Sequence, residues 1–407
     1  MINKLMAVGL ASALFSMSAT AAENPVTPVS PVLHMTMEDG ALTGDGADVI
    51  IAHIKDSQFI LVGEDHGFAD PPEIAAALAR VARPFGFNHH VIEAGPVSVD
   101  WAANILRRDG VDGLAEGLRG RSLALPFLTL REDAMLASEI LSAGGTLWGV
   151  DQEFVGGPLI VFEILAERAK GSKAKTEINA LLAAEQDAFA TGNQGALFLF
   201  SADDAAFSKL ESLFPCDKTA LEIIAGLRES ADIYQAYGRG DNFGSNTARI
   251  ALIRRQFLEA YHGAREDVPK VIFKMGALHT GLGSTYLNTF DLGSLTEGMA
   301  AANDMKVLRV VIYPLDGKQT QIRPSADGPF YSADYHSDDV GALLGLAGIN
   351  SADISEQGWS VVALKPIRHA LGQKGIGALS KELKFTLLGY DYLITTRGAR
   401  AATPLEN

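Results

Sequence analysis

Histidines and carboxylates follow short apolar runs at four places in this sequence. The four segments read Gly63-Glu64-Asp65-His66-Gly67, Glu93-Ala94-Gly95, Asp151-Gln152-Glu153 and Gly276-Ala277-Leu278-His279-Thr280-Gly281. If each apolar run is a strand of an open α/β sheet, these segments follow its carboxyl end, where such sheets bind their ligands. We therefore expect their side chains to meet at one edge of the sheet.

The residue types at these ends suit acid–base chemistry. A histidine exchanges a proton near neutral pH because its ordinary pKa is about 6.5, and a carboxylate beside it fixes its tautomer and supports its charged form. We predict that His66 acts as a base, with Glu64 or Glu93 as its partner. His279 lies between glycines in a loop that can approach a ligand closely, as an acid or electrophile must.

Three further polar residues are candidates for the same site. Arg249 is predicted to open an apolar-faced helix, where a positive charge opposes the helix dipole, so it should have an acidic partner or an anionic substrate group nearby. Glu64 and Glu93 are its candidate partners. Asp65 and Asp151 are predicted to contact the substrate.

A divalent metal is an alternative centre for this chemistry. Carboxylate and imidazole groups bind Mn, Co or Zn, and a bound ion lowers the pKa of its water. The candidate ligands are Glu64, His66, Glu93 and His279.

The elements that must position these residues alternate along the chain. Apolar runs separated by helical patterns predict βαβ units, and hence an α/β fold with a central, largely parallel (mixed) sheet flanked by helices. Strands are expected at 59–62, 90–92, 146–150, 271–275, 307–313 and 390–395. Residues of about 155–245 carry helical patterns and almost no strand signal, so we expect a helical insertion there, either covering the site or serving as a structural layer.

The N-terminus has the pattern of a secretory signal peptide. Lys4 precedes an apolar run, and small residues lead to Glu23, which predicts a signal over residues 1–22 and a periplasmic or secreted protein. The run is too short to cross a bilayer. A proline-rich tether is expected over 23–33, and a single α/β domain over 34–407.

The net charge and the cysteine content limit the classes of molecule that this protein can bind. The formal net charge of −15 opposes binding to nucleic acid, and Cys216, the single cysteine, excludes an internal disulfide or a cysteine-based cluster within one chain. Because no cysteine follows the signal to accept a lipid, no membrane anchor is expected after cleavage. We expect a small-molecule substrate.

Taken in order, these segments resemble the erythromycin esterase-like family, which belongs to a superfamily with ChaN-type haem-uptake and Tiki/TraB proteins. The resemblance covers most of residues 55–315. In erythromycin esterases two residues usually separate the Glu from the His, whereas here only Asp65 does, as in the ChaN and TraB pattern. The matching segments are Phe59-Ile-Leu-Val-Gly-Glu-Asp-His-Gly67, Val91-Ile-Glu93, Trp148-Gly-Val-Asp-Gln-Glu153, Asn246-Thr-Ala-Arg249 and Phe273-Lys-Met-Gly-Ala-Leu-His279.

The resemblance implies a hydrolase of an ester or amide bond, in which His66 is the general base on water. The matching site residues are Glu64, His66, Glu93, Arg249 and His279. Two alternatives come with it. One is a metal-dependent hydrolase of the Tiki/TraB kind, and the other is a ChaN-like haem- or iron-binding protein with His66 or His279 as axial ligand.

Overall fold

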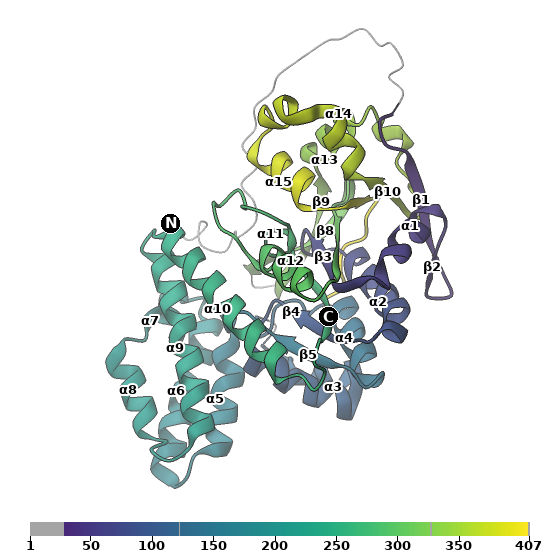
Figure 1. Cartoon of the computed structure of the whole chain (residues 1–407). Helices are drawn as coiled ribbons and strands as arrows, with labels where there is room; N and C mark the ends of the chain where they lie inside the picture. Colours follow the sequence, from purple (N-terminus) through teal and green to yellow (C-terminus); the bar gives the residue numbers. More distant parts are fainter. Residues whose placement is uncertain (1–27, 122, 326–327, 406–407) are drawn as a thin grey trace.

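The computed structural model describes residues 28–121, 123–325 and 328–405 (Figure 1). Its main sheet consists of β1 (Val32–Glu38), β2 (Ala41–Thr43), β3 (Ser57–Glu64), β4 (Phe87–Ile92), β5 (Thr146–Gly149), β6 (Lys270–Gly276), β7 (Lys306–Ile312), β10 (Trp359–Ala363) and β11 (Tyr392–Thr395). The order across the sheet is β2-β1-β10-β11-β7-β3-β6-β4-β5. A separate hairpin pairs β8 (Asp316–Ser325) with β9 (Gly328–His336).

The six predicted strands are all present, and they form the parallel part of the sheet from β11 to β5. Most of these strands are buried on both faces, which explains their continuous apolar runs. In the centre, Glu64 of β3 stands in register with Gly276 of β6 and with Ile312 of β7. The carboxyl ends of the central strands therefore finish at one level.

Helices cover both faces of the sheet. They are α1 (Asp45–Ile54), α2 (Asp70–Ala82), α3 (Pro96–Gly117), α4 (Arg131–Ser142), α10 (Asn242–Gly263), α11 (Ala277–Thr280), α12 (Leu292–Ala302), α13 (Asp338–Leu346), α14 (Leu364–Gly377) and α15 (Lys381–Gly389). Side chains alternate along β3, so Ile60 and Val62 share a core with α1 and α2, whereas Phe59 and Leu61 share one with α10 and α12.

The predicted helical insertion is a lobe beside the sheet (Figure 1). It contains α5 (Gly157–Arg168), α6 (Ser172–Ala190), α7 (Phe198–Ser201), α8 (Asp204–Ser212) and α9 (Lys218–Gly238), and these helices bury a core of their own. The helix α10 follows the lobe directly, as the helix predicted to carry Arg249, and the chain then returns to the sheet at β6. α10 thus connects the lobe to the sheet.

The ordered fold begins earlier than the predicted boundary at residue 34. Ser30 is fully buried and donates a hydrogen bond to the carbonyl of Ala363, and strand β1 starts at Val32. Pro31 is compatible with this start because a proline is tolerated at the beginning of a strand. The predicted signal peptide, over residues 1–22, and the first part of the tether lie outside the described residues.

Within the described residues, no helix is both long enough and apolar enough to span a membrane.

Candidate active site

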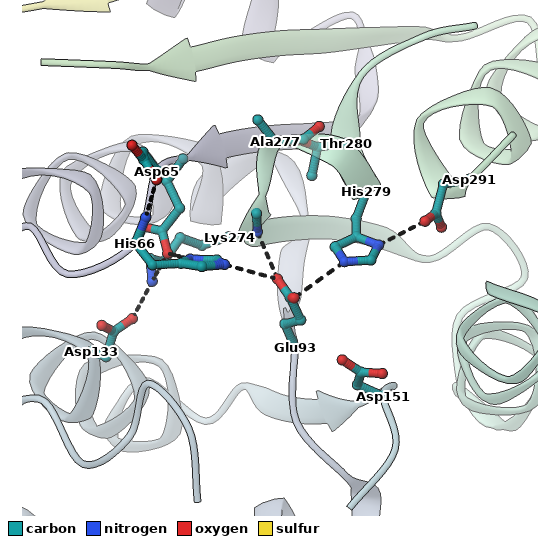
Figure 2. Close-up of polar contacts among 12 residues, drawn as sticks. Asp65, His66, Glu93, Asp133, Asp151, Lys274, Ala277, His279, Thr280 and Asp291 are labelled. Carbon is teal, nitrogen blue, oxygen red and sulfur yellow. Dashed lines mark hydrogen bonds and ion pairs between the residues drawn. The ribbon is translucent and has the colours of Figure 1, made fainter. Parts of the chain in front are cut away.

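The side chains predicted to carry chemistry lie close together, and Figure 2 shows Asp65, His66, Glu93, Asp151 and His279 among them. β6 lies between β3 and β4, so Glu64 at the end of β3 and Glu93 just after β4 both border the end of β6. The chain leaves β6 through the short helix α11, which carries His279. His66 and His279 approach the same carboxylate, at 4.0 Å and 3.2 Å from Glu93 oxygens.

His66 is the most accessible member of this group. Its Nδ1 lies 2.8 Å from Oε1 of Glu64, and its Nε2 faces Oε2 of Glu93. An ionised carboxylate only accepts hydrogen bonds, so Nδ1 carries the hydrogen and Nε2 is the basic nitrogen. The His66 side chain is 42% exposed, whereas those of Glu64 and Glu93 are 2% and 5% exposed.

The buried Lys274 is a second partner of Glu64. Its Nζ donates to Oε1 of Glu64 at 2.8 Å and to Oδ1 of Asp133, in the first turn of α4, at 2.5 Å. Phe127 lies over both cationic partners of Glu64, with its ring centre 4.7 Å from the His66 ring centre and 5.1 Å from Lys274 Nζ. Lys274, Asp133 and Phe127 were not among the predicted site residues. A lysine within the apolar run of 271–275 was the available signal for Lys274.

Glu93 is the central anion of the site. Its Oε2 accepts the backbone N–H of Gly276 at 2.7 Å, and its Oε1 lies 3.2 Å from His279 Nε2 and 2.9 Å from Arg249 Nη2. A Cβ at Gly276 would lie 3.0 Å from the His66 ring and 3.3 Å from Oε2 of Glu93, so a side chain there would push these groups aside. The glycine lets the end of β6 lie against both His66 and Glu93.

His279 is held between two carboxylates. Its Nδ1 lies 2.7 Å from Asp291, which also caps α12, and its Nε2 contacts Glu93. Burial lowers the pKa of His279, but the charges of Glu93 and Asp291 outweigh it and raise that pKa to about 10. At neutral pH His279 is therefore a fixed imidazolium and not a base. Sequence analysis missed Asp291, although an Asp ahead of a helix is a capping signal.

Arg249 pairs with Glu93, one of its two candidate partners, and with Asp151, which was expected to contact the substrate. The helix that carries it begins at Asn242, capped by Asp241, so Arg249 lies about two turns inside α10 and not at its opening. Its guanidinium donates to Glu93 and, through Nε and Nη2, to both oxygens of Asp151. Asp151 is buried and pairs with Arg249.

Asp65 connects the site to the β8–β9 hairpin. Its Oδ1 accepts the backbone N–H of His66 at 3.1 Å, and its Oδ2 accepts the hydroxyl of Tyr335 at 2.9 Å. Gln319 of the same hairpin donates to the carbonyl of His66 at 2.8 Å. The hairpin thus fixes the backbone of the loop that presents His66.

The surrounding charges set the protonation of the two glutamates and of His66. Burial alone would raise the pKa of Glu64, but Lys274 and His66 hold it below its ordinary value. Burial likewise opposes ionisation of Glu93, whose pKa His279, His66 and Arg249 hold well below the usual range. For His66, burial lowers the pKa, but the hydrogen bond to Glu64 and the charges of Glu93 and Glu64 raise it above 6.5.

The predicted metal ligands are already paired with protein cations. Lys274 forms an ion pair with Glu64, and Arg249 and His279 form ion pairs with Glu93. A divalent ion would therefore meet these positive charges in place of free lone pairs on the carboxylate oxygens. Among the residues that the structure describes, no three His, Cys, Asp or Glu side chains form a metal-binding group. For haem, His279 offers no nitrogen free of a carboxylate, so His66 is the one candidate axial ligand of the predicted pair.

Comparison with known proteins identifies the fold. Neither a family profile nor a curated protein matches the sequence. Among solved structures, a mutant of the erythromycin esterase EreC in its open conformation aligns with a TM-score of 0.57 at 13% identity, over 88% of this chain and 95% of its own. A succinoglycan biosynthesis protein aligns with a TM-score of 0.51 at 11% identity, over 86% of this chain and 90% of its own.

A third structure, ChaN of Campylobacter jejuni with cofacially bound haem, aligns with a TM-score of 0.32 at 11% identity, over 75% of this chain and 97% of its own. The alignments with EreC and the succinoglycan protein confirm the predicted erythromycin esterase-like fold. At these identities the similarity concerns the fold, so the reaction has to be argued from the site itself.

Proposed function

We propose that this protein hydrolyses an ester or amide bond, with His66 as the general base on water. One observation carries the proposal: His66 is the one titratable group of the cluster that combines a fixed tautomer with broad access to solvent. The esterase fold of its structural neighbour supports the same class of reaction.

The reaction follows from the roles of His66 and Glu64. Nε2 of His66 takes a proton from a water molecule while the water oxygen attacks the carbonyl carbon of the substrate. Glu64, bonded to Nδ1, stabilises the imidazolium that forms. The tetrahedral intermediate then collapses, and His66 returns its proton to the departing alcohol or amine.

Arg249 is the better placed of the two predicted cations to meet the oxyanion of that intermediate. Its side chain is 25% exposed, whereas that of His279 is 10% exposed and lies between Glu93 and Asp291. A preorganised cation close to developing negative charge lowers the barrier of such reactions. In this proposal His279 and Asp151 act by holding Glu93 and Arg249.

The experiment is hydrolysis of p-nitrophenyl acetate and p-nitrophenyl butyrate by the wild type and by His66→Asn. We expect kcat/KM to fall by about 10²- to 10⁴-fold in the variant, as for loss of a general base. His369→Asn is the matched control, since His369 is exposed on α14. Circular dichroism spectra check that each variant folds. An undiminished rate in folded His66→Asn would rule out the mechanism.

We also propose that the protein works outside the cytoplasm, on the basis of its signal-like N-terminus. The test is fractionation of cells that express the full chain or a chain lacking residues 1–22. The full chain should appear, shortened, in the periplasmic or culture fraction. Retention of an unprocessed full chain in the cytoplasm would contradict the proposal.

A further inference from the structure

Lys274 is a charged side chain in the middle of the sheet. It is 3% exposed, and its strand neighbours Ile272, Phe273 and Met275 are all buried core residues. Taking an ammonium group out of water has a large free-energy cost, and an apolar residue in such a place is often at least as stabilising as an ion pair. The fold alone therefore does not account for a lysine here.

The contacts of Lys274 lead directly to the predicted base. Its Nζ and Nδ1 of His66 both donate to the same oxygen, Oε1 of Glu64, each at 2.8 Å. On the other side, Nζ donates to Asp133 at 2.5 Å. Asp133, Lys274, Glu64 and His66 thus form a row of alternating charge that runs from α4 to the half-exposed imidazole.

The other groups around Lys274 leave its charge intact. His90, on the neighbouring strand β4, is buried, and burial together with Lys274 lowers its pKa to about 4, so it is neutral at pH 7. The ring of Phe127 covers Nζ and stabilises a cation through its π face. Glu64 and Asp133 are the anions bonded to Lys274, so its ammonium is shared between the carboxylate that orients His66 and a structural one.

The shared oxygen has a consequence for His66. A buried carboxylate needs a positive partner to stay ionised, and without Lys274 the cation hydrogen-bonded to Glu64 would be a protonated His66. His66 would then form a permanent ion pair and could no longer accept a proton. We propose that Lys274, held by Asp133, is a positioning residue that neutralises Glu64 permanently and so leaves His66 free to exchange its proton.

The inference rests on the proposed role of His66, but its test requires no substrate. The imidazole of His66 is titrated by NMR in the wild type, Lys274→Met and Asp133→Asn, and its signal is assigned by its absence from His66→Asn. In Lys274→Met we expect the midpoint of His66 to rise by about 1 or more, because the competing cation is gone. In Asp133→Asn we expect it to fall, because Lys274 then acts on Glu64 and His66 uncompensated.

Lys270→Met is the matched control, since Lys270 lies on the same strand at its other end. The control should leave the midpoint of His66 unchanged. Shifts in opposite directions would support the proposal, because a merely structural role gives no such signature. The Asp133→Asn variant keeps the proposal testable if Lys274→Met does not fold.

The proposal is overturned if the His66 midpoint falls in Lys274→Met, or if it does not fall in folded Asp133→Asn. The failures of the two proposals are distinguishable. Opposite shifts without ester hydrolysis would remove the proposed function and leave the positioning role. Hydrolysis that depends on His66, with midpoints that do not move, would leave the function and remove the positioning role.

Discussion

The two glutamates of the site stand on either side of β6 and have contrasting environments. Glu64 has one fixed cation, Lys274, and one titratable partner, His66, which is exposed. Glu93 has two fixed cations, Arg249 and His279, each of which is held by a further carboxylate. The row of charges through Glu64 ends at a side chain that solvent reaches, whereas each cation bonded to Glu93 is paired with a further carboxylate.

The contrast shows how one pair of residue types can serve two purposes. Each histidine has its Nδ1 bonded to a carboxylate, yet His66 has one hydrogen-bonded anion and His279 lies between two at short distance. The second anion turns the imidazole into a permanent cation. The number of close carboxylates, and not the residue type, separates a base from a structural ion.

Of the changes that test this contrast between Glu64 and Glu93, removing the charge of Glu93 should have the largest effect on stability. Glu93→Gln leaves Arg249 and His279 without their shared anion, so we expect the free energy of unfolding to fall by about 3–5 kcal/mol in urea titrations. Glu139→Gln is the control, because its exposed pair with Arg80 should contribute less than about 1 kcal/mol. Equal losses in the two variants would contradict this arrangement of paired charges around Glu93.

A second effect concerns stability against pH. The pKa of His279 is about 10 in the folded protein, above the ordinary 6.5, so its stabilisation is complete below pH 6.5 and is lost as pH rises through 10. The stability difference between wild type and His279→Gln should therefore shrink, by about 4 kcal/mol, from about pH 6 to about pH 10. Denaturant unfolding at several pH values measures it, and a constant difference would refute the assignment.

The third effect concerns the pH dependence of activity at His66. Its raised pKa predicts that kcat/KM falls about tenfold for each pH unit below a midpoint above 6.5. Glu64→Gln removes the hydrogen-bonded charge that raises this pKa, so the midpoint should move to lower pH and the plateau rate should fall about tenfold. If the pH midpoint of kcat/KM in Glu64→Gln stays the same or moves upward, Glu64 does not raise the pKa of His66.

The smallest effect should come from the hairpin. Tyr335→Phe removes the hydrogen bond to Asp65, and we expect a loss of about 1 kcal/mol in stability with a decrease of about fivefold in kcat/KM. Tyr331→Phe, on the same strand, is the control, because its hydroxyl donates to Gln321 within the hairpin. A larger effect in the control would show that the hairpin does not act through Asp65.

The sequence predicted the part of the fold that is buried on both sides. Six parallel strands stand out as continuous apolar runs, whereas β1, with the exposed His34 and the half-buried Thr36 in its middle, was partly assigned to the tether. Antiparallel strands at the sheet edge alternate polar and apolar residues and give weaker signals over short lengths. β10 was missed although it is longer than β5 and β11, because the polar Ser360 interrupts its apolar run.

The site was predictable as far as strand ends define it. Glu64, His66, Glu93 and His279 follow from one rule, and the structure brings them together. The groups that set their protonation came from elsewhere, because sequence spacing does not tell which helix lies beside a strand end. Asp133 on α4 and Asp291 before α12 could be recognised only once those helices were packed.

The strand order also has a consequence for how the chain folds. β6 lies between β3 and β4, although the bonded pair Glu93 and Gly276 is 183 positions apart in the chain. During synthesis, the first strands therefore have unpaired inner edges until the whole helical lobe has been made. Such long-range pairing slows folding and exposes strand edges to aggregation. A fragment that stops short of Asp291 lacks part of the site, so such a truncation should abolish the proposed hydrolysis as a whole.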